Sequence, residues 1–104
     1  MKAPQTGNSD FVMKLYISGS TPRSKRAVEN FRKLSQGLEG GDFEVIDVLE
    51  EPQAAENEKI LATPLLIKHS PPPSQRIIGD LSDSERVLEV LGISDEDGKG
   101  GNGR

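Results

Sequence analysis

Apolar residues recur along the chain in short runs that predict four β-strands. The run at 11–18, FVMKLYIS, has the β-branched and aromatic character of a mostly buried strand, and FEVIDVL at 43–49 predicts a second one. Two further runs, PLLIK at 64–68 and QRIIG at 75–79, flank the segment HSPPPS, which is too rich in proline to be anything but a turn. We expect these last two strands to form a hairpin.

Helical spacing predicts a long helix after the first strand, and composition predicts a short one after the second. The first begins with Thr21 as its N-cap and Pro22 at the first helical position, which needs no N–H, and it ends near the glycines at 37–41. Its apolar stripe consists of Ala27, Val28, Phe31, Leu34 and Leu38. The second helix, rich in Ala, Glu and Lys, is expected from Pro52 to about Leu61.

A third helix is predicted to follow a capping box. In that box the Ser82 hydroxyl and the Glu85 carboxylate each satisfy the other residue's backbone N–H. The buried face of this helix consists of Val87, Leu88 and Leu91.

The resulting element order is βαβαββα, an α/β fold with a thioredoxin-like topology. A helix between two strands predicts a parallel crossover, and the later hairpin adds antiparallel strands. The expected architecture is a four-stranded mixed sheet with three helices, formed by a single domain over residues 11–93. The polar segment 1–10 and the glycine-rich tail 94–104 are expected to be disordered because of their composition.

Composition narrows the possible chemistry. A chain of 104 residues is enough for one domain, and the lack of cysteine excludes disulfides, thiolate catalysis and Cys-ligated zinc. The net charge of −4 argues against nucleic acid as the main partner. No apolar run approaches the ~18 residues of a membrane span, and the first residues lack the apolar core of a signal peptide. We expect a cytoplasmic protein with no cofactor, no metal and no membrane partner.

The segment LYISGSTPRSKRA at 15–27 combines a strand, a tight turn and a helix, an arrangement in which many α/β proteins hold their chemistry. Thioredoxins carry Cys-x-x-Cys in this turn, and here positions 18–21 read SGST. The turn is not a P-loop, because the G-x-x-x-x-G-K-[ST] spacing is missing and Pro22 removes one N–H donor. A second thioredoxin-like feature is the tripeptide Ala-Thr-Pro at 62–64, the place at which the fold carries a cis-proline before its third strand.

Charged residues offer a few further candidates. Three cations occupy the first turn of the first helix: Arg23, Lys25 and Arg26. They oppose the helix dipole by a few tenths of a kcal/mol each, and they form either a solvated face or a patch for an acidic protein surface. His69 is expected to be an exposed turn residue, because no nucleophile motif accompanies it. The adjacent carboxylates of Glu50 and Glu51 precede the second helix and are expected to interact favourably with the positive end of its dipole, which is a structural role.

Three blocks of the sequence resemble the KaiB family of circadian-clock proteins. They are KLYISGSTPRSKRA at 14–27, VIDVLEEPQAAENEKILATPLL at 45–66 and PPPSQRIIGDLSDSERVLEVL at 71–91. The chain departs from clock members by a shorter link before the second strand. It also carries acidic residues at positions where clock members tend to have neutral or basic ones. These acidic residues are Asp42, Glu44, Glu50 and Glu51. These departures indicate a divergent paralogue.

The resemblance implies a non-enzymatic regulator that binds the hexameric ATPase KaiC on its first ATPase ring and modulates its phosphorylation cycle. It also implies capture of the activator KaiA and competition with a histidine kinase whose sensor domain is KaiB-like. The partner-binding residues that it implies are Arg23, Arg26, Lys59, Lys68 and Arg76. The alternative is a cysteine-free thioredoxin-like adaptor in stress or two-component signalling.

The resemblance further implies two folds, a tetrameric ground state with a different C-terminal half and a monomeric thioredoxin-like state that binds KaiC. X-Pro bonds isomerise over about tens of seconds, so the prolines are expected to help set the barrier between the folds. They are Pro64, Pro71, Pro72 and Pro73. Val90 stands where clock members commonly have glycine, which is roughly 1 kcal/mol unfavourable inside a helix. We therefore expect the thioredoxin-like state here, as a monomer or weak dimer.

Overall fold

The computed structural model describes residues 11–38 and 40–92, and its elements follow the predicted order βαβαββα. The strands are β1 (Val12–Ile17), β2 (Asp42–Asp47), β3 (Leu65–Ser70) and β4 (Gln75–Ile78). The helices are α1 (Pro22–Gln36), α2 (Pro52–Asn57) and α3 (Ser84–Leu91). The predicted disordered segments, 1–10 and 94–104, lie outside the described residues.

The four strands form one mixed sheet in the order β2-β1-β3-β4. Strands β1 and β2 are parallel, as predicted from the helix between them, with Met13 opposite Phe43. Strand β3 runs antiparallel to both of its neighbours, and Leu66 lies opposite Leu15 on one side and Ile77 on the other. The predicted α/β fold, with its hairpin after a parallel pair, is therefore confirmed.

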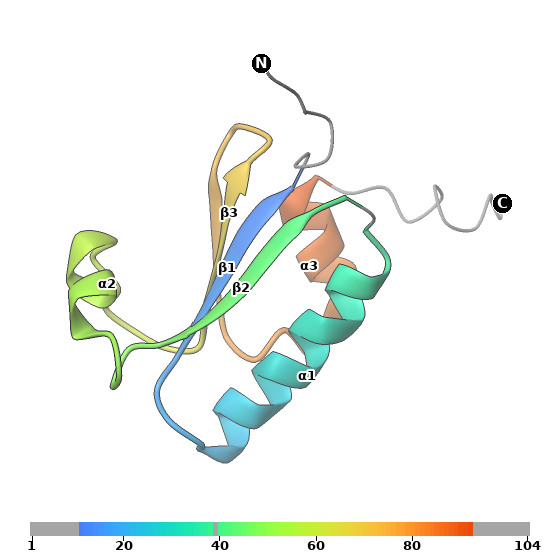
Figure 1. Ribbon diagram of the computed structural model, residues 1–104. Coiled ribbons are helices and arrows are strands. Elements are labelled where there is room, and N and C mark those ends of the chain that lie inside the picture. Colours follow the sequence, from blue (N-terminus) through green and yellow to red (C-terminus); the bar gives the residue numbers. More distant parts are fainter. Residues whose placement is uncertain (1–10, 39, 93–104) are drawn as a thin grey trace, which may run out of the picture.

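Helices α1 and α3 cover one face of the sheet (Figure 1). The main core lies between these two helices and the sheet. It contains Met13, Leu15, Ala27, Phe31, Leu66, Ile77, Leu81, Val87 and Leu91. An edge-to-face contact between Phe31 and Phe43, with ring centroids 6.0 Å apart, joins α1 to the edge strand β2. The helical stripe predicted for α1 thus packs against alternate positions of the strands.

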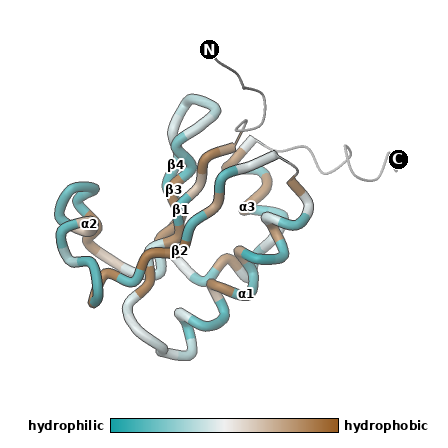
Figure 2. Tube along the Cα trace, in the orientation of Figure 1, coloured by the Kyte–Doolittle hydropathy of each residue, from teal (hydrophilic) through white to brown (hydrophobic). Residues whose placement is uncertain are grey.

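The opposite face of the sheet has a smaller apolar cluster. It consists of Tyr16, Ile46, Leu65 and Ile67, and Val48, Ala54 and Ile60 pack against it. In the described part of the chain, this face is approached by the short helix α2 and by the segments before and after it, and Figure 2 shows the α2 turn as largely hydrophilic. Most of α2 therefore faces solvent, and no helix in the described ranges is long and apolar enough to cross a membrane.

Two predicted helix boundaries are wrong. Helix α2 ends at Asn57 rather than Leu61, because Lys59 adopts the left-handed conformation with φ of 55° and turns the chain. Helix α3 has Asp83 as its N-cap, and the Asp83 side chain accepts a hydrogen bond from the Arg86 amide at 3.2 Å. The expected capping box fails because the Ser82 amide instead donates to Asp80 Oδ1 at 3.1 Å.

The proline-rich turn is shorter than predicted. Strand β3 continues to Ser70, so His69 belongs to a strand and not to the turn. The peptide bonds Thr63-Pro64, Ser70-Pro71 and Pro72-Pro73 are cis, which confirms the expected cis-proline before β3.

Candidate functional site

The turn after β1 is held by hydrogen bonds among its own hydroxyl groups. Thr21 Oγ1 accepts from the Ser24 amide at 3.1 Å, which confirms the predicted N-cap, and also donates to Ser24 Oγ at 3.0 Å. Ser18 Oγ lies 2.6 Å from Thr63 Oγ1, the residue before the cis-proline. Among the described residues, no hydrogen bond joins these hydroxyls to a histidine or a carboxylate. The arrangement joins β1, α1 and the loop before β3.

Asp47 closes the same region from the end of β2. Its Oδ1 accepts hydrogen bonds from the Gly19 amide at 3.0 Å and the Leu49 amide at 2.9 Å. Gly19 has φ of 70°, a conformation that glycine adopts without strain. The carboxylate therefore satisfies the backbone of two loops, and the turn at 18–21 has a structural role.

Two of the predicted partner-binding cations lie at the start of α1. Arg23 and Arg26 are both exposed, and Arg26 Nε forms an ion pair with Asp80 Oδ2 at 3.0 Å. Hydrogen bonds from Arg26 and Ser82 lower the pKa of Asp80 to about 2. The guanidinium of Arg26 thus links α1 to the loop that follows β4.

Two other predicted cations lie on the opposite side of the sheet. The strand register places Arg76 of β4 opposite Ile67, on the α2 face. Its Nη2 donates to the Glu58 carbonyl at 2.8 Å and lies 3.5 Å from Glu58 Oε1. Lys59 follows Glu58 directly and is exposed. The five predicted residues therefore do not form one patch, because these two and the α1 pair occupy different faces.

Lys68 is not a surface residue in this fold. The residue is 4% exposed, and Nζ donates to the carbonyl oxygen of Leu91, the last residue of α3, at 3.0 Å. A cation at a helix C-terminus interacts favourably with the helix dipole. Strand alternation points Lys68 beneath α3, on the face of Leu66, so in this fold the predicted partner-binding lysine is not exposed to a partner.

His69 is partly buried, contrary to the prediction of an exposed histidine. Its Nε2 is enclosed and has no hydrogen-bond partner in the described part of the chain. The neighbouring prolines at 71–73 are exposed, as expected for a turn. Within residues 11–38 and 40–92, no three His, Asp or Glu side chains are placed to hold a metal ion.

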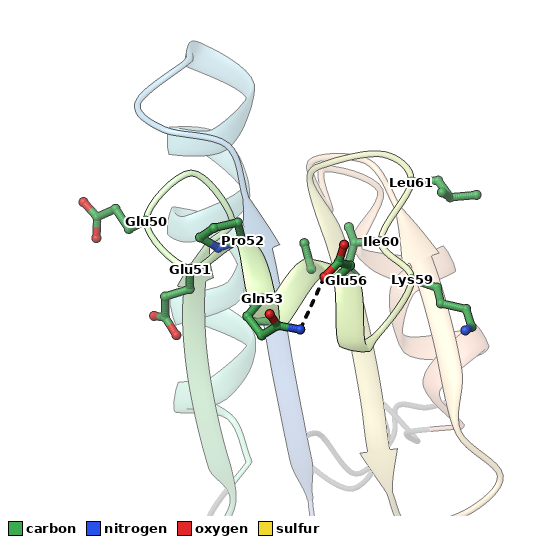
Figure 3. A pocket seen from close by; sticks show the side chains of 10 residues that line it. Glu50, Glu51, Pro52, Gln53, Glu56, Lys59, Ile60 and Leu61 are labelled. Carbon is green, nitrogen blue, oxygen red and sulfur yellow. Dashed lines mark hydrogen bonds between the residues drawn. The ribbon is translucent and has the colours of Figure 1, made fainter.

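An open groove of about 920 Å³ lies beside α2, and the sequence patterns did not predict it. Its apolar wall includes Pro52, Ala54, Ala55, Ile60 and Leu61. Three acidic residues, Glu50, Glu51 and Glu56, also line the groove and form its rim, and the Glu50 side chain points outward (Figure 3). The segment at 50–61, EEPQAAENEKIL, mixes acidic, amide and aliphatic residues, and this composition alone does not indicate a groove.

Comparison with known proteins identifies a family and several relatives to which the chain is similar. A KaiB family model, described as a KaiB domain, matches residues 14–93. The circadian clock protein KaiB3 of Synechocystis sp. is 52% identical over 87 residues, which cover 82% of this chain and 85% of that protein. The circadian clock oscillator protein KaiB of Prochlorococcus marinus is 52% identical over 85 residues, covering 80% of this chain and 81% of that one.

Solved structures agree on the fold. The N-terminal domain of Synechococcus elongatus SasA has a TM-score of 0.65 and 23% identity, covering 91% of this chain and 95% of that chain. Mitochondrial thioredoxin 3 from Saccharomyces cerevisiae has a TM-score of 0.68 and 19% identity, covering 82% of this chain and 80% of that chain. At these identities the likeness concerns the fold, which is thioredoxin-like as predicted.

Proposed function

The chain belongs to the KaiB family, and from this membership we propose that it is a non-enzymatic clock-type regulator that docks onto a KaiC-like hexameric ATPase in the cytoplasm. It would modulate the phosphorylation cycle of that ring without chemistry of its own. The observation that carries the proposal is the family match over residues 14–93, which span nearly all of the described domain.

The cations at the start of α1 are the first proposed contact. Arg23 is exposed and forms no ion pair with another described residue, so its guanidinium is available to a carboxylate on the ring. Arg26 is held by Asp80, and docking through it requires the partner to share or replace that ion pair. Arg23 therefore gives the cleaner test of this surface.

Lys59 and Arg76 are the second proposed contact, on the α2 face. Lys59 can be tested without disturbing the fold, because asparagine tolerates its left-handed φ of 55° better than most residues. Arg76 is a less suitable target, since its Nη2 satisfies the Glu58 carbonyl. For Lys68 we propose a positioning role, because its hydrogen bond to the Leu91 carbonyl oxygen holds α3.

A pull-down against the KaiC hexamer from the same organism, in both phosphorylation states, tests the proposal. We expect the chain to be retained by the ring, and Arg23→Glu or Lys59→Asn to weaken retention about tenfold or more. Arg32→Glu, an exposed charge reversal further along α1, is the matched control and should retain binding. Absence of binding in either phosphorylation state would contradict the proposal and favour an adaptor role outside a Kai system.

KaiA and a histidine kinase with a KaiB-like domain are proposed as further partners. Because such a kinase shares the fold, it is expected to compete with this chain for one site on the ring. Adding the isolated KaiB-like domain of the kinase to a preformed complex should displace this chain in a concentration-dependent way. Simultaneous binding of both proteins to every ring subunit would contradict competition.

A further inference from the structure

The groove beside α2 leaves aliphatic surface in water that the fold does not use. Leu61, on its wall, is 95% exposed, and Leu49, which immediately precedes the rim residue Glu50, is 70% exposed. Other large aliphatic residues of this region, such as Ile46 and Leu65, are almost fully buried. Exposed aliphatic side chains around a concave surface are typical of a binding site for another molecule.

The rim of this groove carries negative charge that no described cation neutralises. Glu50, Glu51 and Glu56 are exposed and form no ion pair with another described residue. Glu56 Oε1 accepts only a long hydrogen bond, 3.4 Å, from Gln53 Nε2 (Figure 3). Lys59 is the one cation among the residues that line the groove. The groove therefore combines an apolar wall with an excess of carboxylates.

We propose that this groove, lined by Glu50, Glu51, Glu56, Ile60 and Leu61, docks a basic segment of a protein partner that presents an aliphatic side chain. Lysine or arginine side chains of the segment pair with the rim carboxylates, and the aliphatic side chain packs on the apolar wall. Nucleic acids and anionic membranes carry the same sign of charge as the rim and are repelled.

This surface differs from the proposed ring contacts in the sign of its charge, and Lys59 is the one residue that it shares with them. The ring contacts rest on cations, whereas the groove presents carboxylates, so the two are expected to serve different segments. Neutralising the carboxylates should weaken binding of the basic segment to the groove and leave retention of this chain by the KaiC ring unchanged. Failure of one proposal can thus be told from failure of the other.

The chain has a built-in optical probe for the experiment. Tyr16 is its only tyrosine and there is no tryptophan, and the Tyr16 cluster packs against Ala54 and Ile60 of the groove wall. The probe ligand is a synthetic decapeptide with a central leucine between lysines and without aromatic residues. Its binding is measured by tyrosine fluorescence and by amide chemical shifts of residues 50–61.

We expect saturable binding that weakens as salt is added, because exposed charge pairs are screened. Glu50→Gln with Glu51→Gln should weaken it by about 3- to 10-fold, the effect of losing two exposed charge pairs. The control, Glu29→Gln with Glu89→Gln, removes the same charge from exposed positions on α1 and α3 and should leave binding unchanged. A peptide with serine in place of leucine, or the Leu61→Ser variant, should bind more weakly than the parent pair.

Three results would overturn the proposal. An equal loss in the rim and control variants would mean unspecific attraction to a net negative protein. Chemical shift changes confined to α1 or α3 would place the peptide elsewhere. Self-association that the Glu50→Gln and Glu51→Gln changes abolish, without any peptide, would mean that a second copy of this chain occupies the groove.

Discussion

Replacing Lys68 by methionine removes the one buried ammonium group of the described residues and keeps most of its aliphatic stem in place. In the native chain, Nζ of Lys68 donates to the Leu91 carbonyl oxygen at the end of α3. The variant leaves that carbonyl without its partner and removes a positive charge from a helix C-terminus. Strand β3 and α3 then lose their only hydrogen bond between side chain and backbone among the described contacts.

Two opposing effects set the size of the change. A hydrogen bond from a charged group contributes about 1.5–3 kcal/mol, and a cation near a partly buried helix end adds up to ~2 kcal/mol. Removing the buried charge recovers part of its desolvation free energy, which opposes this loss. We expect a net destabilisation of α3 by about 1–2 kcal/mol, against the roughly 1.5–3 kcal/mol that burying each of Val87 and Leu91 contributes.

Native-state hydrogen exchange measures this locally. A loss of 1–2 kcal/mol corresponds to about 5- to 30-fold faster exchange, expected in the α3 amides and not in those of β1. Lys25→Met, at an exposed position of α1, is the control and should change exchange less than twofold. Unchanged or slower exchange in α3 would refute the reasoning. So would lost KaiC-ring binding with α3 exchange at the native rate, because Lys68 would then touch the partner directly.

Three further predictions concern titration and capping. The Asp80 carboxyl, followed by NMR, should titrate at about pH 2 in the native chain; its stabilising effect is present above its ordinary pKa of 3.8 and is lost as pH falls through about 2. Arg26→Gln should move that midpoint toward 3.8, and an unmoved midpoint would show that the ion pair has no such effect. Burial, with the nearby carboxylates, raises the pKa of Tyr16 above 10.0, so phenolate absorbance should appear at higher pH than in the unfolded chain, and the associated stability should disappear as pH rises through that raised value. Thr21→Ala should lower the free energy of unfolding by about 1 kcal/mol in urea denaturation, while exposed Ser20→Ala changes little; equal effects would contradict a capping role.

Local signals in the sequence predicted the elements well where short-range contacts decide them. Thr21 caps α1 because its hydroxyl needs only an amide three residues away. The same kind of signal failed at Ser82, because the carboxylate of Asp80 engages the Ser82 amide, and Asp83 takes over the cap. The end of α2 was misplaced for a similar reason, since the left-handed Lys59 has no recognisable signature in its residue type.

The candidate site was less predictable, because its properties depend on what packs above each strand. Periodicity places Lys68 in a strand, yet a lysine there is compatible with either face. Only the docking of α3 shows that it is buried and bonded to Leu91. The groove beside α2 likewise depends on the chain turning back toward β3 after Lys59, which brings Ile60 to the smaller apolar cluster.

By itself, the sequence determined the order of strands and helices, the absence of thiol chemistry and the family to which the chain belongs. These follow from residue types and their spacing, which need no knowledge of distant contacts. Only the tertiary structure decided which charged side chains are exposed and unpaired, and which are paired or buried within the fold. It pairs Arg26 with Asp80, places Arg76 beside Glu58 and buries Lys68. Each of these contacts joins residues far apart in the chain, so their energies depend on a geometry that only the packed sheet and helices provide.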